Sequence, residues 1–176
     1  MVKKILIVIA VLIAGVLVYA AMQPSTFHFE RSAEIKAPPE KIYAVLNDFQ
    51  QSPNWSPYEK KDPAMKRSFS GPATGKGSVY AFEGNGEIGA GRLEIVESIP
   101  AQKIALRLDM IKPFEGSNTI EYKLEPKGDA TKITWSMDGK SPFLARLVCL
   151  FFNMEEMMGK DFDTGLANLK AYVEKS

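Results

Sequence analysis

Few side chains in this 176-residue chain have the types and spacing that covalent or acid–base chemistry needs. His28 is the single histidine and Cys149 the single cysteine; histidine is the usual general base near neutral pH, and cysteine is a common nucleophile. His28 falls on the polar side of an alternating segment, and nothing in the sequence places an acid or a nucleophile beside it. Cys149 falls in the apolar run 147–151, where we expect an inert, buried thiol. We therefore predict no catalytic residue, no metal site and no cofactor.

A glycine-rich run at residues 84–89 matches the GxGxxG spacing of dinucleotide-binding loops. In those loops the glycines open a helix whose N-terminus holds a pyrophosphate. Here residues 92–95 follow with the sequence Arg-Leu-Glu-Ile, which is typical of a strand. We therefore interpret residues 84–89 as a glycine-rich turn between two strands.

The charge balance argues against a nucleic-acid partner. The chain has 22 Lys and Arg against 21 Asp and Glu, a formal net charge of +1. No basic stripe interleaved with aromatic residues is visible in the sequence. The single cysteine also excludes an internal disulfide and a cysteine-based zinc cluster.

The N-terminal segment, residues 1–24, is typical of a membrane anchor. Lys3 and Lys4 precede an uncharged, mostly aliphatic run at residues 5–22, which as a helix spans about 27 Å of a bilayer core about 30 Å thick. The alternative is a signal peptide cleaved before Ala21, although the apolar core of a signal peptide is usually about 7–15 residues long. Lys3 and Lys4 are expected to stay in the cytoplasm. The domain at residues 27–176 would then be extracytoplasmic, on a single-pass anchor or released as a secreted or periplasmic protein.

Seven segments of that domain alternate apolar and polar residues as half-buried strands do. Short turns such as residues 127–129 join several of them, which indicates an antiparallel meander with one wet face. In the first segment Arg31 falls on the same side as Phe29 and Ala33. Either a bulge or an exposed strand end explains it, or it is an inward cation that needs a partner. The segments are residues 27–36, 64–70, 78–83, 92–99, 103–111, 117–125 and 131–138.

Two helical segments accompany the strands, a short one after the first strand and a long one at the C-terminus. Ser141 and Pro142 suit the N-cap and first position of the long helix, and one continuous apolar stripe then covers residues 144–173. Gly159 and Gly165 interrupt the stripe, and two explanations stay open. They either allow a kink or close packing against the sheet, or leave space for a ligand. A curved sheet closed over one helix is expected to leave a space between them.

Four segments carry a family resemblance: residues 35–43, 55–57, 82–85 and 162–170. Together they resemble the polyketide cyclase/dehydrase and lipid-transport family of the START-like, birch-pollen-allergen-like superfamily, over roughly residues 27–176. The resemblance implies an α+β helix-grip fold, with a seven-stranded curved antiparallel sheet wrapped around a long C-terminal helix and two small helices after the first strand. No catalytic residue can be carried over from the resemblance, because the superfamily includes carriers, cyclases, hydroxylase domains and chaperone regulators.

Three functions fit the sequence. We favour a membrane-tethered binding or carrier protein for a small hydrophobic molecule or lipid, held between sheet and C-terminal helix and anchored through residues 5–22. A cyclase-like enzyme would need inward polar groups such as Arg31, Asn118 and Tyr122 to converge in the same cavity. A protein-interaction module would have a filled core. The residues expected to line the cavity are Trp55, Tyr80, Phe82, Met110, Asn118, Tyr122, Trp135, Met154, Met158 and Phe162.

Overall fold

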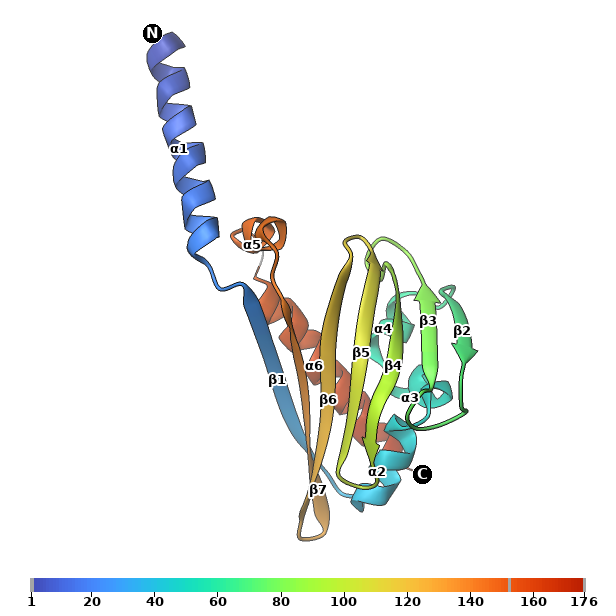
Figure 1. Ribbon diagram of the computed structural model, residues 1–176. Coiled ribbons are helices and arrows are strands. Elements are labelled where there is room, and N and C mark those ends of the chain that lie inside the picture. Colours follow the sequence, from blue (N-terminus) through green and yellow to red (C-terminus); the bar gives the residue numbers. More distant parts are fainter. Residues whose placement is uncertain (1, 152, 176) are drawn as a thin grey trace.

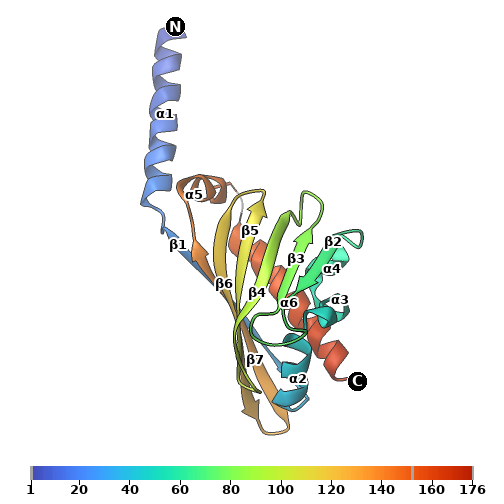
Figure 2. The ribbon, with the colours of Figure 1, turned by 45° about the vertical axis from the view of Figure 1, so that its right-hand side comes forward.

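A curved, seven-stranded antiparallel sheet forms the body of the protein in the computed structural model, which describes residues 2–151 and 153–175. Helix α6 (Met154–Val173) crosses the concave face of the sheet diagonally, and helix α1 (Val2–Met22) projects away from one end of it (Figure 1, Figure 2). This is the α+β helix-grip architecture that the sequence predicts, with an apolar helix before it.

The sheet has the strand order β1-β7-β6-β5-β4-β3-β2, so the first strand pairs with the last. The predicted strands are confirmed to within a few residues, because alternating side chains suit a sheet with one buried face. Residues 84–89 join β3 to β4, which confirms their interpretation as a turn. The strands are β1 (Thr26–Ile35), β2 (Lys66–Ser70), β3 (Val79–Glu83), β4 (Ala90–Ile99), β5 (Lys103–Lys112), β6 (Gly116–Lys127) and β7 (Ala130–Lys140).

Short helical segments link β1 to β2, where the resemblance implied two small helices. Pro39 and Pro57 each begin a helix, since proline fits the first turn, where its missing N–H has no partner to lose. Helix α2 buries Ile42 and Leu46. The segments are α2 (Pro39–Leu46), the 3₁₀ turn η1 (Phe49–Gln51), α3 (Ser52–Trp55) and α4 (Pro57–Lys61).

The prediction of one unbroken C-terminal helix is wrong. Helix α5 (Phe143–Cys149) is separate from α6, and Ser141 does not cap it. The Asn153 side chain caps α6 by accepting a hydrogen bond from the Glu156 backbone N–H at 3.1 Å. An apolar stripe shows that a helix buries one side, but it does not show which element covers that side. Here α6 packs on β1, whereas α5 packs beside α1.

The expectation that Cys149 is buried is also wrong. Its side chain lies at the end of α5 and is exposed, as are the side chains of Leu144 and Phe151. Helix α5 lies beyond the ends of β1 and β7, level with the last turn of α1 (Figure 1, Figure 2). The apolar run around Cys149 therefore has no sheet to cover it.

Burial is uneven along the concave face. Near the β6–β7 turn, inward residues such as Ile35, Leu124 and Ile133 are fully buried. Toward the end from which α1 projects, inward residues of the same sheet are only half-buried, among them Leu93 and Leu108. Helix α6 runs from that end of β1 toward α2, and so leaves the same end of β4 and β5 uncovered (Figure 1). We call this half-buried part of the concave face, around Leu93 and Leu108, the open end.

The two glycines of the α6 stripe are sites of close packing. A Cβ at Gly165 would lie 2.6 Å from Cζ3 of Trp135 and 3.1 Å from Cδ of Pro57. A Cβ at Gly159 would overlap the guanidinium of Arg31. Arg31 and Trp135 are cross-strand partners on β1 and β7. Of the two explanations left open for these glycines, the structure supports close approach of the sheet.

Candidate functional site

The predicted cavity residues divide between two levels of the concave face. One group is buried between the sheet and the helices, and the other group is half-buried and borders the open end. The buried residues are Trp55, Tyr80, Tyr122, Trp135 and Phe162. The half-buried residues are Phe82, Met110, Asn118, Met154 and Met158.

Four of the buried residues pack ring against ring. Trp135 stacks on Phe162 with ring centres 4.2 Å apart and 10° between the planes. Trp55 meets Trp135 edge-on at 5.9 Å, and Tyr122 lies 5.3 Å from Trp135. Such contacts are favourable beyond the area that they bury. We call these four residues the aromatic floor, because they fill the space beneath the open end.

The aromatic floor contains hydrogen-bond donors that the protein leaves unpaired. The indole Nε1 groups of Trp55 and Trp135 are buried, and no residue in the described part of the chain accepts from them. A buried donor without a partner costs about 1–3 kcal/mol. Burial raises the pKa of Tyr122, and the neighbouring Tyr58 raises it further, so this phenol is protonated at neutral pH. The floor therefore offers donors rather than a general base.

Flexible apolar side chains border the open end from two sides. On the sheet, Phe82 and Met110 lie over Gly91, where a Cβ would be 3.0 Å from Cζ of Phe82 and 3.2 Å from Sδ of Met110. On the other side, the first turns of α6 contribute Met154 and Met158. Methionine adapts its shape easily, so such a border can accommodate ligands of irregular outline.

Two polar side chains also lie on the concave face. The β1–β7 pairing contains no bulge at Arg31, so this residue is the inward cation that the sequence left as an alternative. Its Nη1 donates to the carbonyl oxygen of Glu30 at 2.7 Å, and its Nε lies 3.8 Å from the Asp163 carboxylate. The side chain of Asn118 fills the space above Gly139. A Cβ atom added at Gly139 would overlap the side-chain oxygen of Asn118. Both polar groups therefore already have neighbours within the protein.

A buried ion pair beside the site was missed by the sequence reasoning. The Glu59 carboxylate accepts hydrogen bonds from Nε of Arg67 at 2.7 Å and from the Tyr80 hydroxyl at 2.6 Å. Burial, followed by this hydrogen bond, raises the pKa of Tyr80. Arg67 shares the inward side of β2 with Phe69, so the alternation could have revealed it, but nothing in the sequence marks Glu59. Because these groups satisfy one another, we interpret them as a link between α4 and strands β2 and β3.

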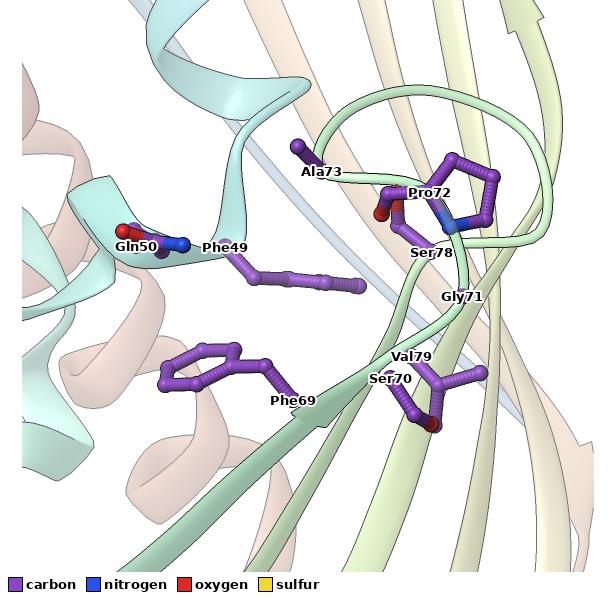
Figure 3. A pocket seen from close by; sticks show the side chains of 9 residues that line it. All are labelled: Phe49, Gln50, Phe69, Ser70, Gly71, Pro72, Ala73, Ser78 and Val79. Atoms are coloured by element: carbon purple, nitrogen blue, oxygen red, sulfur yellow. The ribbon is translucent and has the colours of Figure 1, made fainter.

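A pocket of about 250 Å³ opens at the edge of the sheet, between η1 and the β2–β3 loop. Phe49 and Phe69 flank it on one side, and Pro72 and Ser78 lie on the other (Figure 3). It is smaller than the 300–1,000 Å³ or so of a typical ligand site. None of the predicted cavity residues lines it.

A shallower hollow of about 380 Å³ lies over β2 to β5. Its border combines residues that alternation places on the outer face of the sheet with residues of the inward side. The former include Ser68, Ala81 and Glu83, and the latter are Arg67, Phe82 and Gly91. Phe82 is the one predicted cavity residue that borders it.

Among residues 2–151 and 153–175, no three His, Cys, Asp or Glu side chains gather as a metal site requires.

Fold and site together define a helix-grip protein with an apolar concave face. The chain belongs to the family described as polyketide cyclase/dehydrase and lipid transport, whose sequence model matches residues 26–174. None of the curated proteins compared with the chain matches it.

Several solved structures are similar in fold. Ara h 8.0201 is 16% identical, with a TM-score of 0.62 over 86% of this chain and 99% of that one. The di-domain ARO/CYC StfQ from the steffimycin biosynthetic pathway is 12% identical, with a TM-score of 0.63 over 85% of this chain and 51% of that one. Aha1 from Colwellia psychrerythraea is 19% identical, with a TM-score of 0.54 over 82% and 96%. At these identities the likeness shows the fold alone.

Proposed function

We propose that this protein binds a small hydrophobic molecule, or a lipid, at the open end of the concave face, while α1 tethers it to a membrane. The observation that carries the proposal is the half-buried apolar border of Phe82, Met110, Met154 and Met158 above the aromatic floor. Apolar surface that the fold leaves half-covered gains free energy when a ligand covers it. The family description, which includes lipid transport, agrees with this function.

Cyclisation of a hydrophobic substrate is the second candidate, because one structural relative is an ARO/CYC protein of a biosynthetic pathway. It needs polar groups that act together on the substrate. Within the described residues, however, no hydrogen bond joins Arg31, Asn118 and Tyr122. The phenol of Tyr122 has a raised pKa and is no base at neutral pH. His28 lies on the outer face of β1, bonded to Asp138 at 2.7 Å. These observations favour binding over acid–base catalysis.

The membrane tether rests on α1. Among the described residues, α1 is a helix long and apolar enough to cross a membrane by length and composition, a test that a signal sequence also passes. A retained anchor is favoured because Nη1 of Arg146 donates to the carbonyl oxygens of Ala21 at 2.9 Å and Gln23 at 3.0 Å, tying α1 to α5. Lys3 and Lys4 precede the helix and favour an extracytoplasmic domain by the positive-inside rule. The test is the intact mass of the mature protein. A mass that corresponds to a chain starting at Ala21 would overturn the tether.

Dansyl-labelled undecanoic acid tests the binding proposal. The full chain in detergent micelles is titrated with this probe, and energy transfer from Trp55 and Trp135 to the dansyl group is recorded. Both indoles lie in the aromatic floor. Energy transfer is therefore more efficient to probe bound near the open end than to probe dissolved in the micelle. We expect saturable transfer at one site. A folded protein that shows no saturable transfer would instead support an interaction module with a filled core.

Neighbouring methionines of α6 provide the matched variants. Met158→Arg places a charge at the border of the open end and is expected to weaken probe binding at least tenfold. Met157→Arg introduces the same charge on the exposed side of the helix and is expected to leave binding unchanged. Thermal unfolding of both variants shows whether each is folded. Equal effects of the two substitutions would contradict this location of the site.

A further inference from the structure

Exposed apolar side chains gather at the end of the domain from which α1 projects. Ile111 and Phe114 lie at the β5–β6 turn, and Phe143, Leu144, Val148 and Phe151 lie on α5 and just after it. The β5–β6 turn and α5 stand at about the level of the last turn of α1 in both views, with α5 beside α1 and the β5–β6 turn on the far side of α5 (Figure 1, Figure 2). We call these six residues the end surface. Large hydrophobic residues exposed together in this way mark an interaction site.

The end surface is held at a fixed place relative to α1. The two hydrogen bonds from Arg146 to carbonyl oxygens of Ala21 and Gln23 satisfy acceptors that the end of a helix leaves free. Ala20 is fully buried in α1, whose other residues are exposed. Only residues 23–25 separate α1 from β1. The domain therefore cannot move far from the end of α1.

The position of the end surface along α1 identifies its partner. The uncharged run of α1, residues 5–22, spans about 27 Å, close to the thickness of a bilayer core. If α1 crosses a bilayer, Met22 lies near one boundary of that core. The end surface, level with the last turn of α1, then lies at the depth of the lipid headgroups and upper acyl chains. Helices that expose an apolar face bind membranes at that depth, whatever their length.

We propose that the end surface docks on the same bilayer that α1 crosses, with α5 and the β5–β6 turn lying in its interfacial layer. This inference rests on the membrane tether of the proposed function. Docking turns the open end of the concave face toward lipid instead of water, because Met110 precedes the β5–β6 turn and Met154 begins α6 just after α5. The ligand then exchanges with the bilayer, which identifies its class as a membrane-soluble molecule.

The single cysteine makes the test direct. Cys149 is exposed on α5, so a nitroxide label attached to it in the full chain reports the environment of the end surface. The protein is reconstituted in vesicles of three parts phosphatidylcholine to one part phosphatidylglycerol. Collision of the label with oxygen, which concentrates in lipid, is compared with collision with a water-soluble nickel chelate. We expect the oxygen-to-nickel collision ratio to be several-fold higher at Cys149 than at a position in water.

Three labelled variants, each carrying Cys149→Ser, complete the experiment. Phe114→Cys reports the β5–β6 turn and is expected to resemble Cys149. Asp129→Cys lies in the β6–β7 turn at the opposite end of the sheet (Figure 1) and is expected to be aqueous. Leu12→Cys lies in the middle of α1 and reports the tether itself.

The outcomes separate the docking proposal from the tether. A lipid-exposed label at Leu12→Cys with aqueous labels at Cys149 and Phe114→Cys overturns docking and leaves the tether intact. An aqueous label at Leu12→Cys overturns the tether, and docking with it. Labels at Cys149 and Phe114→Cys that are shielded from both oxygen and nickel show that protein, such as a second copy of the chain, covers the end surface, and this also overturns docking.

Discussion

The ring of Trp135 on β7 lies parallel to the ring of Phe162 on α6, with centres 4.2 Å apart. Both side chains are almost completely buried. This contact joins the middle of β7, the strand next to the edge strand β1, to the middle of the long helix, and the other rings of the aromatic floor pack around it. The position of α6 on the sheet, and hence of the open end, depends on this pair.

Removing one ring of the pair should be costly. Phe162→Ala is expected to lower the free energy of unfolding by about 3–5 kcal/mol, the usual cost of truncating a buried phenylalanine. Met157→Ala, on the exposed side of the same helix, should change it by no more than about 0.5 kcal/mol. Chemical denaturation of the full chain in detergent micelles measures both. A loss below about 1 kcal/mol for Phe162→Ala would show that α6 is not held through this stack.

The two glycines of α6 should respond differently to the same substitution. Alanine is favoured over glycine by about 1 kcal/mol inside a helix. At Gly165 the added methyl group meets the Trp135 ring and Pro57, which cannot move easily, so Gly165→Ala is expected to be destabilising by about 1–3 kcal/mol. At Gly159 it meets the mobile end of Arg31, so Gly159→Ala is expected to be neutral or stabilising. The order of the two thermal midpoints is the measurement. A lower midpoint for Gly159→Ala than for Gly165→Ala would contradict this packing.

Much of the fold could be predicted because strand alternation reports a local property, the side of the chain that faces the core. The sheet, its hairpins and the glycine-rich turn at residues 84–89 all follow from it. Helical periodicity is less informative about the partner of a helix. The stripe at residues 144–173 looks continuous in the sequence, although α5 and α6 face different neighbours. The break is marked in the sequence by Asn153, an N-cap residue, which is followed by Glu155 and Glu156. Acidic residues are favourable in the first turn of a helix.

The candidate site could be predicted only in part. The sequence shows which aromatic and methionine side chains point inward, but not which of them fill the core. Trp135 and Phe162 pack against each other because Gly165 lets the helix approach, and this depends on residues far apart in the chain. The partner of Arg67 is equally hidden, since Glu59 lies in a short helix without a periodic pattern. Whether the half-buried residues bind a ligand is a prediction that the probe titration tests.

The Glu59–Arg67 pair should be sensitive to loss of one partner and tolerant of loss of both. Glu59→Ala leaves Arg67 and the Tyr80 hydroxyl without their acceptor, and is expected to cost about 3–5 kcal/mol of unfolding free energy. The double variant Glu59→Leu with Arg67→Met replaces the pair by apolar side chains. It is expected to recover part of that loss, because no charge stays buried without a partner, although the Tyr80 hydroxyl still lacks its acceptor. Equal destabilisation of the single and double variants would instead show that the side chains matter mainly through their packing.

A pH dependence is expected from His28. A hydrogen bond to Asp138, 2.7 Å away, raises the pKa of this histidine, and the nearby Glu30 carboxylate adds to the effect. Since His28 is the single histidine, its ring protons give one set of NMR signals, whose titration in the full chain in micelles measures the pKa. The value should lie above 6.5 and return toward 6.5 in Asp138→Asn. A native pKa at or below 6.5 would mean that this hydrogen bond does not form in solution.

The sign of the effect on stability follows from that shift. Because folding raises the pKa of His28, the protonated ring stabilises the folded state, fully below about pH 6.5 and progressively less as the pH rises through the folded value. The ring is largely exposed, so solvent screening limits the contribution to less than about 1 kcal/mol. Unfolding free energies measured between pH 5.5 and about pH 8.5 should therefore fall slightly more in the native chain than in His28→Gln, which removes the titrating group. The native chain could instead gain stability relative to His28→Gln as the pH rises. In that case the pKa shift has the opposite sign, and the contact with Asp138 does not control the titration of His28.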